Sequence, residues 1–268
     1  NMILHRVLPL TMLLALASCY NYCNNKTHVC NLGGLKHFMC RLEEELPPYN
    51  ETTLVDIIPD TRNLQTDMVV LLNNFRDMMA SGQAITKLNK TFPSATRMRR
   101  LIWDNELAYL SRVHASTVSF KHTECRSTLR FPFVGEITAM MAAPLKKKLT
   151  IDGALRRVFR RIWKTHRDVE DPKKFIEAFT TTSNFSADDL AIIINDRVSR
   201  FGCGIAVGSK DSSSFFYFLT CYFDNTNIVN APIYKPGVPT SGCDEWEAVP
   251  SIKWSYLCKN LGLIFPND

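Results

Sequence analysis

Apolar residues that recur at three- and four-residue steps predict three amphipathic helices in the first two thirds of the chain. The first covers residues 64–79, with Gly82 placed to end it. The second covers residues 104–118. The third, residues 151–167, has the clearest pattern, because its apolar and basic residues take opposite sides of the helix.

The last third of the chain changes to a strand-like pattern. Residues 201–207 and 215–223 are predicted strands, joined by the polar turn 208–214. The apolar run 190–194 is compatible with either a strand or a helix. Because the predicted helices come mainly before these strands, the order favours an α+β fold with an antiparallel sheet over a parallel βαβ array.

The amino terminus has the pattern of a secretory signal peptide. His5 and Arg6 precede an apolar run, residues 7–17, which is too short to span a bilayer. We assign residues 1–19 to the signal peptide, with cleavage after Ala17 or Cys19; a buried amino-terminal helix is the alternative. No later apolar run is long enough to span a membrane, so we expect a secreted, extracellular protein without a transmembrane segment once mature.

The cysteine count agrees with export. Loss of Cys19 leaves eight of the nine cysteines, an even number suited to four disulfide bridges in an oxidising compartment. No two of them form a C-x-x-C pair. Four Asn-x-Ser/Thr sequons are candidate glycosylation sites, at Asn25, Asn50, Asn89 and Asn184.

Short motifs in a fixed order resemble the CAP superfamily, which groups cysteine-rich secretory proteins, antigen 5 and pathogenesis-related proteins. The matching segments are Asn73-Asn-Phe-Arg76 (H-N-x-x-R), Trp103-Asp-Asn-Glu-Leu-Ala-Tyr109 (W-x-x-E-L-A-x), His122-Thr-Glu-Cys125 (H-D-x-C), Gly135-Glu-Ile137 (G-E-N-I), Gly202-Cys-Gly204 (V-G-C-G) and Leu219-Thr-Cys-Tyr222 (the C-x-Y signature). The spacing of the first cysteines and the tail 232–243 resemble the insect venom allergen branch, antigen 5.

This resemblance implies a three-layer α-β-α sandwich with an antiparallel central sheet. It divides the chain into an amino-terminal cysteine loop and linker (20–60), a CAP or SCP-like domain (61–230) and a disulfide-closed extension (231–268). Within the first part we expect residues 20–41 to form a stapled loop rather than a helix. The implied disulfides are Cys23–Cys40, Cys30–Cys125, Cys203–Cys221 and, for the two remaining cysteines, Cys243–Cys258.

The family cleft presents two histidines and two glutamates. The resemblance places His122 and Glu136 at two of these positions, but His166 stands where the second glutamate is expected and Asp189 where the second histidine is expected. Imidazole and carboxylate together can bind zinc. The alternative is a set of polar residues lining a cleft that has lost its ligands, and we expect no cofactor.

We expect a non-enzymatic binding or signalling protein, because neither a G-x-S-x-G nor an H-E-x-x-H motif is present. The family resemblance suggests a reproductive (seminal-fluid) or host-interaction factor. A sterol or lipid carrier and a divalent-metal-dependent hydrolase are the alternatives. The net charge of +6 is mild, and without exposed aromatic residues among the basic ones no nucleic acid partner is expected.

The basic side of the third predicted helix is the nearest feature to a binding surface. An extracellular glycan, lipid or acidic protein could bind there, whereas a merely solvated helix face is the alternative. The residues of this surface are Arg156, Arg157, Arg160, Arg161 and Lys164.

Overall fold

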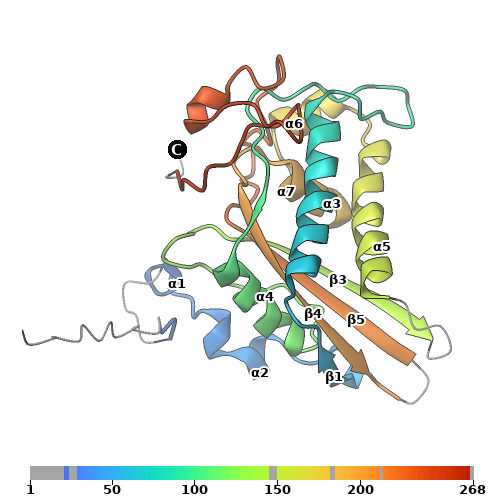
Figure 1. The fold of residues 1–268 in the computed structure, drawn as a ribbon. Helices are drawn as coiled ribbons and strands as arrows, with labels where there is room; N and C mark the ends of the chain where they lie inside the picture. Colours follow the sequence, from blue (N-terminus) through green and yellow to red (C-terminus); the bar gives the residue numbers. More distant parts are fainter. Residues whose placement is uncertain (1–20, 24–28, 145–149, 182–184, 212–213, 266–268) are drawn as a thin grey trace, which may run out of the picture.

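The computed structural model describes residues 21–23, 29–144, 150–181, 185–211 and 214–265. The predicted signal peptide and the sequons at Asn25 and Asn184 lie outside these residues. A sheet forms the middle of the molecule (Figure 1). Its strands are β1 (Thr53–Ile57), β4 (Arg200–Ser209), β5 (Ser214–Phe223) and β3 (Gly135–Pro144), in that spatial order, with the short β2 (Ile102–Trp103) beside β4.

The four main strands pair antiparallel, as predicted. Cys203 lies opposite Cys221, and Tyr222 lies between Gly202 on β4 and Glu136 on β3. Because side chains alternate between the two faces of a sheet, Tyr222, Gly202 and Glu136 share one face and the two cysteines share the other.

Helices cover both faces of this sheet. On the face with the cysteines lie α3 (Arg62–Ala80), α5 (Ile151–Lys164) and α7 (Phe185–Ile194), which share one hydrophobic core with the sheet (Figure 1). On the other face lies α4 (Asn105–Ser116), whose Leu107 and Leu110 pack with Tyr222. The fold is therefore the expected three-layer α-β-α sandwich.

Local sequence explains where the helices begin and end. Thr61, Asp104 and Thr150 precede α3, α4 and α5, and each side chain accepts a hydrogen bond from a backbone amide in the first turn. Gly82 follows α3 with φ +76°, a conformation that favours glycine and confirms the predicted helix end. The run 190–194, which was ambiguous in the sequence, is helical and belongs to α7.

Two glycines of β4 allow α4 to pack directly on the sheet. A Cβ atom at Gly202 would lie 2.1 Å from the backbone nitrogen of Ala108, and one at Gly204 would lie 2.3 Å from Cα of Arg112. Both positions therefore exclude any larger residue unless α4 moves away. This close approach is the physical reason for the Gly202-Cys-Gly204 motif.

Several expectations from the sequence were wrong or incomplete. The segment 20–41 is not free of helix, because it contains α1 (Val29–Leu32) and a 3-10 turn (Phe38–Cys40); α2 (Leu42–Glu45) follows directly. The linker contains β1, which pairs with β4 as an exposed edge strand and so lacks an alternating pattern. Strand β3 and helix α6 (Pro172–Glu177) were also not predicted.

The structure contains the four disulfides that the family resemblance implies: Cys23–Cys40, Cys30–Cys125, Cys203–Cys221 and Cys243–Cys258. The last bond closes the carboxy-terminal extension, which packs beside residues 94–100. There the Cys258 amide donates to the Met98 carbonyl at 2.8 Å. None of the helices described by the structure combines the length and apolar character needed to cross a membrane.

Candidate functional site

A buried carboxylate, Glu136 at the start of β3, is the centre of a polar cluster. Its Oε2 lies 2.9 Å from Nδ1 of His122 and 3.3 Å from Nη1 of Arg126, and its Oε1 lies 3.1 Å from Nδ1 of His114. The backbone amide and hydroxyl of Thr123 also donate to it. An ionised carboxylate offers about four lone-pair sites, so these donors already satisfy Glu136.

The surroundings of Glu136 and His122 favour the charged form of each. Burial by itself raises the pKa of Glu136, but the Arg126 guanidinium and the hydrogen bonds from His114 and His122 outweigh it and hold the pKa well below its ordinary value. The hydrogen bond to Glu136 raises the pKa of His122, against the opposing effect of burial. The His122 interaction therefore stabilises the fold below the ordinary histidine pKa and is lost as the pH rises through the elevated value.

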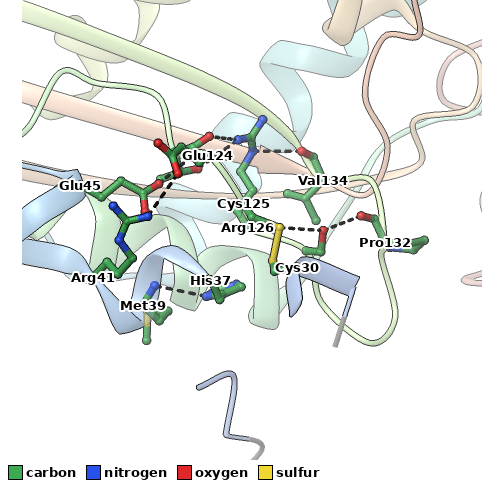
Figure 2. The surroundings of a disulfide bond; sticks show 12 residues. Cys30, His37, Met39, Arg41, Glu45, Glu124, Cys125, Arg126, Pro132 and Val134 are labelled. Carbon is green, nitrogen blue, oxygen red and sulfur yellow. Dashed lines mark hydrogen bonds and ion pairs between the residues drawn. A yellow bond between two sulfur atoms is a disulfide. The ribbon is translucent and has the colours of Figure 1, made fainter. Parts of the chain in front are cut away.

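Figure 2 shows how the amino-terminal region holds the segment that carries His122. Cys125 is joined to Cys30 of α1, and the Glu45 carboxylate of α2 accepts a hydrogen bond from the Glu124 amide at 2.6 Å. Arg126, the next residue, is thereby fixed with its guanidinium at Glu136. The cysteine loop thus orders one wall of the site.

The four sequence-predicted cleft residues do not all meet. His122 and Glu136 are in direct contact, and Asp189 of α7 lies within electrostatic range of both. His166 is held elsewhere. Its Nδ1 lies 2.6 Å from the Trp163 carbonyl and its ring packs against Phe92 and Trp163.

The position of His166 has a local cause. The sequence suggested that the helix continues to residue 167, which would place His166 at the border of the buried stripe and toward the cleft. Instead α5 ends at Lys164, and His166 lies in a 3-10 turn (Thr165–Asp168), whose tighter winding changes the direction of the side chain. Burial lowers the pKa of His166.

Protein donors already occupy the oxygens of Glu136, which makes this carboxylate a poor metal ligand in the present arrangement. Across the described ranges, no three His, Cys, Asp or Glu side chains gather as a metal site requires. His122 has its Nδ1 toward Glu136 and its Nε2 3.4 Å from Thr138 Oγ1. We therefore derive no metal chemistry at this site.

Comparison with protein families identifies the chain. The family model described as "CAP: Cysteine-rich secretory protein family" matches residues 69–223, which include α4, most of α3 and the strands β3, β4 and β5. The chain belongs to the CAP family.

Individual relatives agree with an antigen 5-like CAP protein. Venom allergen-1 of Aedes albopictus is 28% identical over 240 residues, covering 88% of this chain and 88% of the relative. Tabinhibitin 6 of Tabanus yao is 29% identical over 219 residues, covering 78% of this chain and 79% of the relative. The solved structure of NaASP2 with Zn²⁺ has a TM-score of 0.58 at 18% identity, covering 79% of this chain and 99% of that chain, and shows the fold alone.

The cluster around Glu136 includes residues that the sequence analysis did not identify: His114, Thr123, Arg126 and Tyr222. The Tyr222 hydroxyl lies 2.9 Å from Nδ1 of His114, and both side chains are buried. A signal for His114 was present, because it follows Leu107 and Leu110 on the apolar side of the second predicted helix. A histidine on a buried helix face needs a polar partner, which here is Glu136.

A hydroxyl group also lies near His122, the residue of this cluster that could act as a general base. Thr138 Oγ1 is 3.4 Å from Nε2 of His122, whose Nδ1 contacts Glu136. The order hydroxyl, imidazole, carboxylate has the form of a nucleophile–base–acid relay. However, the first distance exceeds the 2.6–3.2 Å typical of a nucleophile bonded to its base.

The remaining predicted surface sites are exposed. The five basic residues of the CAP helix α5 all lie on its solvent side, and the apolar residues of the helix face the core. Asn50 and Asn89 are exposed, with positive φ values of 46° and 57°, so both sequons lie on tight turns at the surface. Whether they carry glycans stays a prediction.

Proposed function

We propose that this CAP protein is a non-enzymatic extracellular binding protein whose recognition surface is the basic face of α5. Five cationic side chains lie between Arg156 and Lys164, about two and a half helical turns, and all are exposed. Of these five side chains, Arg156 alone has an ion-pair partner among the described residues, Asp152 at 2.8 Å. An exposed row of cations, four of which have no ion-pair partner among the described residues, attracts polyanions, so a sulfated glycan is the partner that we favour.

An extracellular location supports this partner class. The four disulfides are typical of an oxidising compartment, and the predicted signal peptide would direct export. The relatives named above as a venom allergen and a tabinhibitin are consistent with a host-interaction factor. Tissue-resolved transcript measurement separates this setting from a reproductive one: salivary expression favours the first and expression in male accessory glands the second.

Retention on heparin resin tests the surface. A variant with Arg156, Arg157, Arg160 and Arg161 changed to Gln is expected to elute at a NaCl concentration lower by about 0.1 M or more, because the attraction is electrostatic and screened by salt. Glutamine keeps the helix propensity, so α5 remains folded.

A second variant controls for net charge. It removes the same number of positive charges from exposed positions spread over other elements: Lys36, Arg62, Lys121 and Lys259, each changed to Gln. This variant is expected to elute close to the wild type. Equal loss of retention in both variants would show that net charge alone causes binding and would refute a site on α5.

We propose no hydrolytic role for the Glu136 cluster. The Thr138 hydroxyl lies 3.4 Å from Nε2 of His122, too long for an activated nucleophile, and the Glu136 carboxylate already accepts hydrogen bonds from several protein donors. Turnover of casein or of an ester substrate that disappears in His122→Ala would contradict this proposal.

One cavity supports a second candidate function, carriage of a neutral apolar ligand such as a sterol. A cavity of about 420 Å³ lies between the edge of the sheet and the first turn of α5, and its lining is mainly apolar. Val55, Ile151, Val207 and Phe215 contribute to the lining, and its acidic residue, Asp56, disfavours an anionic head group. The volume is within the range of small-molecule sites.

Sterol binding can be measured with a fluorescent sterol. Changing Ile151 to Asn is expected to weaken binding by about tenfold, because the cavity then contains an amide that the ligand leaves without a hydrogen bond. Ile85→Asn, at an exposed position outside the cavity, is the matched control. Equal affinity of the Ile151 variant and the wild type would exclude this cavity.

A further inference from the structure

A separate cavity is lined in part by Ile264 and Phe265 of the carboxy-terminal extension, and no residue of α5 is among those that line it. Its volume is about 280 Å³. It is bounded by the loop before β3, the segment between α7 and β4, the end of β5 and the final described residues of the chain. This size suits a small molecule rather than a drug-sized one.

The lining is rich in arginine. Arg99, Arg130 and Arg197 all contribute to it, whereas its acidic residue is Asp224. Asp224 already accepts hydrogen bonds from the amide and hydroxyl of Ser199. The cavity therefore has an excess of positive charge.

The three arginines differ in how far they are already satisfied. Arg130 forms ion pairs with Asp104 at 2.7 Å and with Glu106 at 3.2 Å, so its charge is compensated. Arg197 is half-buried and has no acidic partner among the residues described. It is the cation that a ligand would find available.

Arg99 provides a second group of donors. It is 4% exposed, and its Nη2 donates to the Arg197 carbonyl at 3.0 Å. In the part of the chain that the structure describes, its Nε has no acceptor. Nε is itself buried, but a guanidinium has five N–H donors and Arg99 lines the cavity, so its Nη groups have donors for an anionic oxygen near Arg197.

Aromatic side chains form the rest of the cavity. Phe133 is 51% exposed although it lines the cavity, and Phe265 lies over the Arg99 guanidinium at 5.2 Å. A flat apolar group placed against these rings would be removed from water. The cavity thus combines an apolar wall with a cation that has no ion-pair partner in the described ranges.

We propose that this cavity binds a small aromatic carboxylate, with the carboxylate at Arg197 and Arg99 and the ring against Phe133 and Phe265. Guanidinium groups bind carboxylates through paired, charge-assisted hydrogen bonds, which fixes the orientation of the ligand. The site is distinct from the basic face of α5 and does not depend on the function proposed for it.

Titration calorimetry of the full chain with sodium benzoate tests the site. Benzoate is expected to bind, and Arg197→Gln is expected to weaken binding by at least about tenfold, the loss typical of hydrogen bonds to a charged group. Arg99 bonds to the backbone carbonyl of Arg197, so this change leaves that bond in place. An unchanged thermal unfolding midpoint would verify that the variant is folded.

Two controls make the result specific. Benzyl alcohol, which has the ring without the charge, is expected to bind at least about tenfold more weakly than benzoate. Lys259→Gln removes an exposed charge outside the cavity and is expected to leave benzoate binding unchanged. Absence of benzoate binding, equal binding by Arg197→Gln, or equal binding of benzyl alcohol would each overturn the proposal.

Discussion

Arg76→Ala is expected to destabilise the protein by more than about 4 kcal/mol, a loss that breaking a buried hydrogen-bond network can produce. Arg76 lies on α3, is fully buried, and donates to the backbone carbonyls of Arg99, Ile193, Asn195 and Val198 at 2.7–3.1 Å. Alanine would remove all five of these hydrogen bonds from the core, and of the four carbonyls Asn195 would keep the Val198 amide as a donor. Urea unfolding followed by circular dichroism measures the loss.

Two variants separate the role of the planar guanidinium from charge and helix propensity. Arg76→Lys keeps the charge but has a single ammonium group, so it should recover only part of the lost stability. Arg62→Ala, at an exposed position of the same helix, should change the free energy of unfolding by no more than about 0.5 kcal/mol. If Arg76→Ala unfolds at the urea concentration of Arg62→Ala, the network does not hold these segments together.

Asp189→Asn is expected to stabilise the protein at neutral pH. Burial raises the pKa of Asp189 to about 7, with the charges of Asp188 and Glu136 adding to this effect and those of His122 and Arg161 opposing it. The folded protein therefore holds a proton that the unfolded chain releases at lower pH. The wild type loses stability as the pH rises from about 4 toward 7, and the loss levels off above that value.

Asparagine removes this cost because it stays neutral. The gain should be small near pH 4 and reach roughly 2–4 kcal/mol at pH 8, as measured by thermal or urea unfolding across that range. Asp67→Asn, at an exposed position of α3, should show no comparable pH-dependent gain. A stabilisation independent of pH would mean that Asp189 is ionised in the folded protein and would contradict this explanation.

The sequence determined most of the features that depend on residues close together along the chain. The faces of the three long helices, their caps and the end of α3 at Gly82 follow from apolar spacing and from the hydrogen bonds of short polar side chains. The ordered motifs indicated the CAP family, the three-layer fold and the four disulfide pairs. They also led directly to the contact between His122 and Glu136.

Other features were decided only by tertiary contacts. Strand β3 contains small residues and methionines, and its pairing with β5 makes it a strand. Strand β1 lies exposed at the edge, where no alternation of apolar residues is required. Neither strand therefore had a clear periodic signal.

The site shows the same division. The donors that satisfy Glu136 come from α4 and from the loop after it, and the loop is held by the amino-terminal disulfide, so their meeting depends on long-range packing. His166 was expected to join them, but two residues after the end of α5 it turns toward Phe92 and Trp163 instead. The sequence specified which polar side chains are available. The packing of distant segments decided which of them contact the Glu136 carboxylate.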